Sequence, residues 1–212
     1  MTELLFIRHG YSEGNKSHRF SGQKDFPLDE AGRRQAEELK SYLPKAYHID
    51  AFYSSDLCRA VDTVKPSADA LSLPVHTTAA LREVDVGLGE GVLREDVERL
   101  YPETYALYRN RPGLVRFDGG ESFAEMRERA LLAVREIVAR HEGETVAIAT
   151  HGGVIRALRT LWEDIPLERM EEIPQVPNAS VTVVRYEGET ASLLLIGSCD
   201  HLTERVTERL VN

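Results

Sequence analysis

Two histidines of this chain stand where apolar runs end at glycine. Leu4–Ile7 leads into Arg8 and His9, and a second run, 146–149, leads into His151. Such short apolar runs indicate buried strands, and open α/β sheets bind ligands beyond the carboxyl ends of their strands. A single histidine is more often a packed or solvent-facing ring. Two at matching junctions, with an arginine beside one of them, favour a site that combines cations with a nucleophilic or proton-transferring imidazole.

Four motifs follow one another along the chain and include both junctions. They are Arg8-His9-Gly10-x-Ser12-x-x-Asn15, Ser54-Ser55-x-Leu57-x-Arg59-Ala60-x-x-Thr63, Leu81-Arg82-Glu83 and Thr150-His151-Gly152-Gly153. In this order and approximate spacing they resemble the histidine phosphatase superfamily, whose best-known branch is cofactor-dependent phosphoglycerate mutase. The resemblance covers roughly residues 3–186.

The resemblance implies catalytic roles for four residues of the two junctions and the second motif. His9 would become transiently phosphorylated, while Arg8, Arg59 and His151 would hold the phosphate. A phosphoryl group carries its charge on three peripheral oxygens, so an enzyme that transfers it needs fixed cations and a nucleophile in line with the leaving oxygen. A nucleophilic His9 needs one unprotonated ring nitrogen, with the other held by an acceptor such as a backbone carbonyl.

Glu83 matches the position of the family's proton donor. A leaving group departs far more readily as an alcohol than as an alkoxide, so a donor near the ester oxygen is required. The carboxylic acid must be protonated when substrate binds, and the hypothesis therefore predicts activity that falls as the pH rises. The same carboxylate would then activate the water that attacks the phosphohistidine. The alternative is a surface partner of Arg82.

Five further residues match positions that bind substrate in the family. They are Asn15, Ser21, Gly22, Gln23 and Gly152. Glycine at position 152 lets backbone N–H groups approach an anion without a side chain in the way. Asn15 could equally be a turn residue that bonds its own loop. The sequence has no HExxH motif, no paired aspartates at metal spacing and no GK[ST] loop, so we expect neither a metal nor a cofactor.

Length and composition indicate one α/β domain over residues 1–212. The net charge of −9 argues against nonspecific nucleic-acid binding, whereas residues 8–24 carry four cations against one carboxylate, which suits a small anionic ligand. No signal-peptide pattern, membrane span or disulfide framework is evident, and only Cys58 and Cys199 are present. We therefore expect a cytoplasmic protein without a membrane partner; the sequence does not indicate its oligomeric state.

The alternation of strand and helix patterns predicts a three-layer α/β fold with a mostly parallel sheet and helices on both faces. Expected strands are 3–8, 51–53, 74–77 and the run before His151; expected helices are 29–43, a helix capped by Ser54 or Ser55, 122–140 and 153–162. The strands 180–186 and 191–196 form an antiparallel edge. Residues 87–120 are expected to form a small helical cap, and residues 203–212 to fray or form a short helix.

Within the family, a phosphatase is favoured over a mutase. The resemblance associates mutases with a longer cap, a pair of adjacent arginines and a tryptophan where this chain has Gln23; here the arginines are split as Arg109 and Arg111. The stretch 119–122, Gly-Gly-Glu-Ser, is similar to small phosphatase branches that hydrolyse α-ribazole phosphate, phosphoserine or phosphoglycerates. We predict a metal-independent phosphomonoester hydrolase that acts through a phosphohistidine on a small anionic metabolite.

Two other functions stay open at this point: a cofactor-dependent phosphoglycerate mutase, and a non-catalytic protein that binds a phosphorylated ligand. The sequence does not identify the substrate, nor whether Arg94, Tyr105 and Arg109 of the cap face it. Cys199 and Arg205 have the Cys-x5-Arg spacing of cysteine phosphatases, but the five residues between them include two carboxylates and no glycine. We interpret that spacing as a coincidence.

Overall fold

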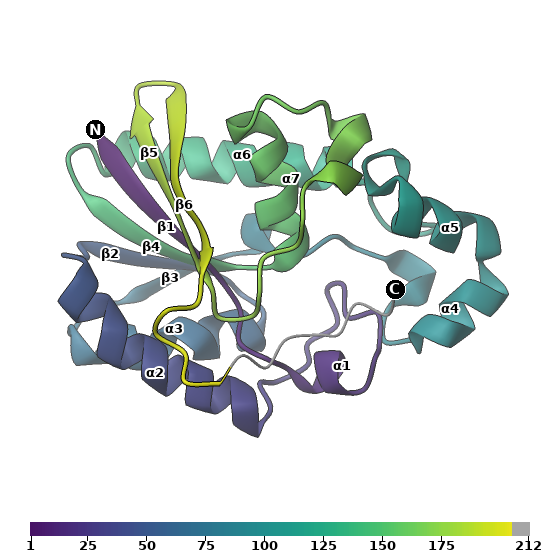
Figure 1. Cartoon of the computed structure of the whole chain (residues 1–212), viewed down its shortest axis with the longest axis horizontal. Helices are drawn as coiled ribbons and strands as arrows, with labels where there is room; N and C mark the ends of the chain where they lie inside the picture. The colour runs from purple at the N-terminus through teal and green to yellow at the C-terminus, as the bar shows by residue number, and fades with distance from the viewer. Residues whose placement is uncertain (205–212) are drawn as a thin grey trace.

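A six-stranded sheet forms the centre of the computed structural model, which describes residues 1–204 (Figure 1). The strands are β1 (Thr2–Arg8), β2 (Ala51–Ser55), β3 (Val75–Thr78), β4 (Thr145–Thr150), β5 (Val181–Glu187) and β6 (Thr190–Ser198). Their order is β3-β2-β4-β1-β5-β6. The first four strands in this order, β3, β2, β4 and β1, run parallel to one another. The hairpin β5–β6 runs antiparallel at one edge, which confirms the predicted sheet.

Helices cover both faces of the sheet. They are α2 (Glu30–Ala46) and α3 (Cys58–Ala70) on one face, and α6 (Phe123–Arg140) and α7 (Gly152–Trp162) on the other (Figure 1). Side chains alternate along β1: Leu5 and Ile7 pack with α2 and α3, whereas Leu4 and Phe6 join the cluster that contains α6 and α7. All four are fully buried. Burial on both faces explains why this strand is continuously apolar.

The register of the sheet brings the two histidine junctions together. Arg8 at the end of β1 pairs with Thr150 at the end of β4, so His9 and His151 follow at adjacent strand ends. The His9 N–H donates to the Thr150 carbonyl at 2.9 Å. On the other side of β4, β2 ends and α3 begins with Arg59 in its first turn. Three motifs separated in sequence therefore meet at one edge of the sheet.

The start of α3 differs from the prediction, because neither Ser54 nor Ser55 caps it. The N-cap residue is Leu57, whose side chain makes no capping bond. Instead, the Asp25 carboxylate accepts a hydrogen bond from the Cys58 N–H at 2.8 Å. A carboxylate at a helix N-terminus satisfies an otherwise unpaired donor and suits the helix dipole. The loop after β1 therefore supplies the cap and is tied to α3.

The long helix α6 begins where its sequence predicted. Ser122 is the N-cap, its Oγ accepts from the Glu125 N–H at 3.2 Å, and Glu125 accepts from the Ser122 N–H at 2.8 Å. This reciprocal pair is the capping box expected from the Ser-x-x-Glu spacing. The helix α2 extends three residues beyond its predicted end, through Ala46, with Pro44 in its last turn.

Between β3 and α6 the chain leaves the sheet and forms a helical segment. Its elements are η1 (Ala79–Leu81), η2 (Gly87–Gly89), α4 (Arg94–Leu100), α5 (Pro102–Asn110) and η3 (Pro112–Leu114). The helices α4 and α5 lie at one end of the molecule, away from the sheet, as expected for a cap (Figure 1). Backbone bonds between Phe20 and residues 91 and 92 tie the segment to the loop after β1.

The remaining elements are α1 (Glu13–Lys16) and η4 (Leu167–Glu172). Within residues 1–204, no helix combines the length and apolarity needed to cross a bilayer. Cys199 is buried, whereas Arg205 lies outside the described residues. A frayed end or a short helix was expected over residues 203–212, and residues 205–212 of this stretch also lie outside the described residues.

Candidate active site

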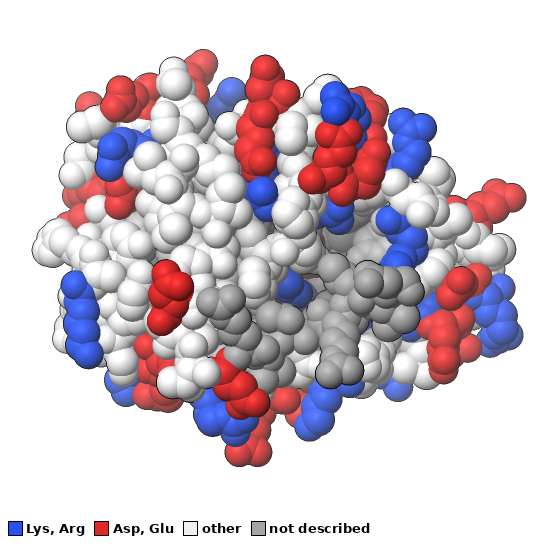
Figure 2. Space-filling view, in the orientation of Figure 1, with Lys and Arg blue, Asp and Glu red and all other residues white. Residues whose placement is uncertain are grey.

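A small cavity of about 80 Å³ lies where the carboxyl ends of β1 and β4 meet the cap and α7. In the part of the chain that the structure describes, its lining includes five arginines and one carboxylate. These are Arg8, Arg19, Arg59, Arg94 and Arg156, with Glu83. The excess of fixed positive charge concentrates anions at this site, although the whole chain is acidic. In the view of Figure 2, acidic and basic side chains are interspersed over the surface, and a few basic side chains lie beside the central hollow.

His9 lines the cavity and is almost completely buried. Its Nδ1 lies 2.7 Å from the Gly10 carbonyl oxygen, which can only accept, so this bond assigns the proton to Nδ1 and leaves Nε2 with a lone pair. Burial, followed by the charges of Arg59 and Arg8, holds the pKa of His9 well below its usual value. The ring is therefore neutral at neutral pH and fixed as a nucleophile must be.

His151 is fully buried beside His9, with the two ring centres 5.2 Å apart. Its Nε2 is 2.9 Å from the Ser55 hydroxyl, while its Nδ1 has no hydrogen-bond partner among the described residues. Burial, followed by the charges of Arg59 and His9, lowers its pKa well below the usual value. Buried polar atoms are seldom left unpaired, so this Nδ1 is a candidate partner for a ligand oxygen, although His151 itself is not among the residues that line the cavity.

Backbone carbonyls orient the two central arginines. Arg59, only 1% exposed, donates to the carbonyls of Lys24 and Gly22 at 2.9 and 2.7 Å, and its Nε has no partner among the described residues. Arg8 donates to the Val176 carbonyl at 2.7 Å. Burial lowers the pKa of Arg59, yet guanidinium groups stay charged in proteins. Because carbonyls do not neutralise a guanidinium, the positive charge of Arg59 can attract an anion, and Arg8 lines the same cavity.

The loop that holds Arg59 is itself held by the cap. The Glu90 carboxylate accepts from the backbone N–H groups of Gln23 and Lys24 at 2.8 and 2.7 Å, and from Val86 at 3.1 Å. These bonds fix the same stretch of backbone whose carbonyls orient Arg59. A residue of the cap thus helps to set the position of a cation in the cavity.

Glu83 lies on the cavity wall with both carboxylate oxygens bonded to backbone. Oε2 accepts from the Gly153 N–H at 2.9 Å, and Oε1 accepts from the Val84 N–H at 3.0 Å. A Cβ at position 153 would lie 2.2 Å from Glu83 Oε1, so this approach requires glycine. The sequence interpretation assigned a role to Gly152 and missed that of Gly153.

Three of the five residues expected to bind substrate line the cavity: Asn15, Ser21 and Gly22. The Asn15 Oδ1 accepts from the N–H and hydroxyl of Ser12 at 3.1 and 2.9 Å, so Asn15 does bond its own loop. The structure records no bond from its Nδ2 to any described residue. The two interpretations of Asn15 are therefore compatible, because its amide oxygen holds the loop while the residue also lines the cavity.

The other two expected residues lie behind the wall. Gln23 donates from Nε2 to the Glu83 carbonyl at 3.3 Å and does not line the cavity. Gly152 lies against Arg8, whose Nε would be 3.1 Å from a Cβ at this position. A side chain at position 152 would crowd the guanidinium, so the glycine leaves the space that Arg8 occupies.

Cap residues behave differently from one another. Arg94 and Tyr108 line the cavity, and the Arg94 guanidinium carbon lies 5.7 Å from the centre of the Phe20 ring. Tyr105 packs against Phe20, with ring centres 6.2 Å apart, and Arg109 is exposed outside the cavity. The interior of the cap is thus aromatic, with one arginine facing the ligand space.

Arg156 and Gln175 also line the cavity and were missed from the sequence. Arg156 donates from Nε to the Ile173 carbonyl at 2.6 Å, and burial lowers its pKa. It lies four residues after Gly152, one turn along α7 and on the same face. That spacing was a usable signal; Gln175, in an irregular segment, offered none.

The two buried histidines make stability depend on pH. Their pKa values are depressed in the folded state, so the unfolded chain binds more protons below about pH 6.5. We expect the free energy of unfolding to be highest above that pH and to fall by up to about 1.4 kcal/mol per pH unit for each histidine as the pH drops. Urea unfolding between about pH 7.5 and 5.5 measures this slope.

One variant tests the assignment. His151→Gln removes one of the two buried histidines and is expected to flatten the slope. An equal slope in wild type and His151→Gln would contradict the assignment.

The chain is similar to known proteins in both sequence and structure. The family model for the histidine phosphatase superfamily (branch 1) matches residues 4–198. Phosphoserine phosphatase 1 of Hydrogenobacter thermophilus is 32% identical over 208 residues, which cover 98% of each chain. A metal-independent phosphoserine phosphatase of Arabidopsis thaliana is 34% identical over 191 residues, covering 89% of this chain and 78% of that one. The solved structure of Bacillus stearothermophilus YhfR, 34% identical, superposes with a TM-score of 0.91 over 95% of this chain and 99% of its own.

Proposed function

The chain belongs to the histidine phosphatase superfamily, and on that premise we propose that it is a metal-independent phosphomonoester hydrolase that acts through a phosphohistidine on a small anionic metabolite. One observation carries the proposal. His9 is neutral, its Nδ1 is held by the Gly10 carbonyl, and it lies on the wall of a cavity with five arginines. A nucleophile and the cations that a phosphoryl group requires thus occur together.

In the first step, the phosphate of the substrate is held by Arg8, Arg59 and the free Nδ1 of His151. The His9 Nε2 attacks phosphorus, a nitrogen–phosphorus bond forms and the ester oxygen–phosphorus bond breaks. The fixed guanidinium groups stabilise charge on the peripheral oxygens without having to reorganise. Glu83, protonated in the complex with substrate, transfers its proton to the departing alcohol oxygen.

In the second step, the Glu83 carboxylate takes a proton from water as the water oxygen attacks the phosphohistidine. The nitrogen–phosphorus bond breaks, inorganic phosphate leaves, and His9 and Glu83 return to their starting states. Asn15, Ser21 and Gly22 complete the wall around the phosphate.

The surplus of cations points to a second anionic group on the substrate. After Arg8 and Arg59 have engaged the phosphate, three of the five arginines still line the cavity: Arg19, Arg94 and Arg156. A carboxylate is the small metabolite group that a guanidinium binds best, through paired charge-assisted hydrogen bonds. Phosphoserine carries such a carboxylate, and two similar proteins bear the name phosphoserine phosphatase. We therefore include phosphorylated carboxylic acids as the favoured substrate class.

Hydrolysis suits the cap better than phosphoryl transfer between two positions of a phosphoglycerate. The split pair Arg109 and Arg111, the nearest equivalent of the arginines expected in a mutase, is exposed and lies outside the cavity. A single domain over 1–212, a cytoplasmic location and the absence of a nucleic-acid partner stay predictions.

Phosphate release in the presence of a chelator tests the proposal. The substrates are phosphoserine, phosphoethanolamine, 3-phosphoglycerate, α-ribazole phosphate and p-nitrophenyl phosphate. We expect turnover that the chelator does not reduce, and a kcat/KM for phosphoserine at least about tenfold above that for phosphoethanolamine, which lacks the carboxylate. Arg156→Met should bring the two values together.

Other outcomes separate the rival functions. Conversion of 3-phosphoglycerate only after priming with a bisphosphoglycerate would identify a mutase. Phosphate binding without turnover of any substrate would identify a non-catalytic binder. Activity that requires an added divalent metal would contradict the metal-independent mechanism.

A further inference from the structure

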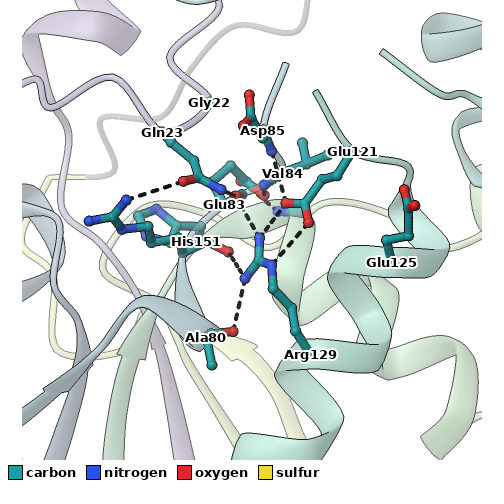
Figure 3. Close-up of polar contacts among 12 residues, drawn as sticks. Gly22, Gln23, Ala80, Glu83, Val84, Asp85, Glu121, Glu125, Arg129 and His151 are labelled. Carbon is teal, nitrogen blue, oxygen red and sulfur yellow. Dashed lines mark hydrogen bonds and ion pairs between the residues drawn. The ribbon is translucent and has the colours of Figure 1, made fainter. Parts of the chain in front are cut away.

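Behind the cavity wall, Arg129 of α6 grips the loop that carries Glu83 (Figure 3). Its Nη1 donates to the carbonyls of Ala80 and Arg82 at 2.9 and 2.8 Å, and its Nη2 donates to the Glu83 carbonyl at 2.9 Å. Three carbonyls of a four-residue stretch thus converge on one guanidinium. Arg129 does not line the cavity, so its contact with the site is indirect.

Glu121 holds Arg129 in place and grips the loop from its other end. Its carboxylate receives both Nε and Nη2 of Arg129, with Nε to Oε2 at 3.0 Å. The same carboxylate accepts from the Asp85 N–H at 2.9 Å. The side chains of Arg129 and Glu121 are 24% and 18% exposed, so water screens the pair only partly. Backbone groups before, at and after residue 83 are therefore bonded to one ion pair.

The two sides of Glu83 are fixed by different elements. Its backbone is held by α6 through Arg129, whereas its carboxylate is held by the N-terminus of α7 through Gly153. A shift of the backbone would move the carboxylate away from that N–H and from the ester oxygen of a bound substrate. Catalytic groups must be held to within roughly half an ångström of their productive position, so such a shift is costly to catalysis.

We propose that Arg129, oriented by Glu121, is a positioning residue that holds Glu83 where it can protonate the leaving group. The assignment rests on the proposed function, because that function makes Glu83 the proton donor of the reaction. It differs from a purely structural role in one measurable respect. A mispositioned proton donor slows only those substrates whose leaving group needs a proton, whereas a loosened fold slows all substrates alike.

The test compares kcat/KM for phosphoserine with that for p-nitrophenyl phosphate. The alkoxide of serine is a poor leaving group, but p-nitrophenolate departs without protonation; kcat/KM reports steps up to formation of the phosphohistidine and excludes its hydrolysis. For Arg129→Met we expect a loss of about 10- to 100-fold with phosphoserine. With p-nitrophenyl phosphate, we expect a change of no more than about threefold.

Arg127→Met is the matched control. Arg127 is a half-buried arginine on the same helix, but it donates to the Thr160 hydroxyl of α7 at 2.8 Å and makes no recorded bond to the loop 80–85. The Arg127→Met variant should leave the ratio of the two kcat/KM values unchanged.

Glu121→Gln keeps Arg129 and removes only the charge of its partner, so it tests the pair even where Arg129→Met folds poorly. It should shift the ratio in the same direction, by a smaller factor.

A double variant shows whether Arg129 acts through Glu83. With phosphoserine, Arg129→Met combined with Glu83→Gln should be no slower than Glu83→Gln alone, because the donor is already absent. Losses that multiply, or an equal loss on both substrates in Arg129→Met, overturn the positioning role and leave the proposed function intact. Absence of phosphate release by the wild-type chain from either substrate overturns the proposed function and this assignment together.

Discussion

His9→Ala is expected to abolish phosphate release from every substrate, with a loss in kcat/KM of at least about 10⁴-fold. The variant lacks the lone pair that forms the bond to phosphorus, and no other neutral side chain among the described residues is comparably placed. The Nε2 of His151 is engaged by Ser55, and its Nδ1 is the atom assigned to holding the phosphate. The remaining arginines would still bind phosphate but could not carry it covalently.

Two measurements accompany the rate. Rapid quenching with labelled substrate should yield a base-stable, acid-labile phosphoprotein in the wild type and none in His9→Ala. Binding of inorganic phosphate to the variant, followed by calorimetry, should persist, because Arg8 and Arg59 remain; this shows that the site is still assembled. A variant with substantial turnover, or an unchanged yield of phosphoprotein, would assign the nucleophile elsewhere.

Glu83→Gln is expected to lower kcat/KM for phosphoserine by about 10²- to 10⁴-fold and to affect p-nitrophenyl phosphate little. Glutamine fills the same space and can still accept one of the two backbone N–H bonds that Glu83 accepts from Val84 and Gly153. It cannot release a proton to the leaving oxygen. The size of the loss should therefore follow the basicity of the leaving group rather than the size of the substrate.

The pH dependence supplies an independent check on the same residue. The sequence hypothesis that Glu83 is the proton donor predicts a kcat/KM for phosphoserine that falls as the pH rises in the wild type. This dependence should disappear in Glu83→Gln. Full turnover of phosphoserine by the variant would falsify the role of Glu83 as proton donor.

Much of the fold could be predicted because its signals are local or periodic. The apolar runs before Arg8 and His151 are strands buried on both faces, and Ser122 with Glu125 marks the start of α6 within four residues. The cap of α3 was predicted wrongly, because its acceptor is Asp25, 33 residues earlier in the chain. Sequence patterns that cover only neighbouring residues cannot identify a partner so far away along the chain.

The candidate site divides in the same way. His9, Arg59 and the other motif residues follow from order and spacing, and the register of β1 and β4 explains why they meet. Gly153 was missed because its role depends on the distance to Glu83, 70 residues away. Arg129 belongs to none of the sequence motifs, and only the folded chain shows that its guanidinium donates to three carbonyls.

The bonds of the Glu90 carboxylate distinguish two parts of the cap, which differ in how freely their amino-acid sequence can change without affecting Arg59. Residues 86–91 are bonded to the loop that orients Arg59, so a substitution there disturbs the chemistry common to all substrates. Beyond them, α4 and α5 bring Arg94 and Tyr108 to the cavity, and the bond from the Arg94 N–H to the His18 carbonyl lies outside the stretch 22–24 that orients Arg59. Selection for a new substrate, or a designer grafting foreign helices, can therefore rewrite the distal part while the proximal part is inherited unchanged.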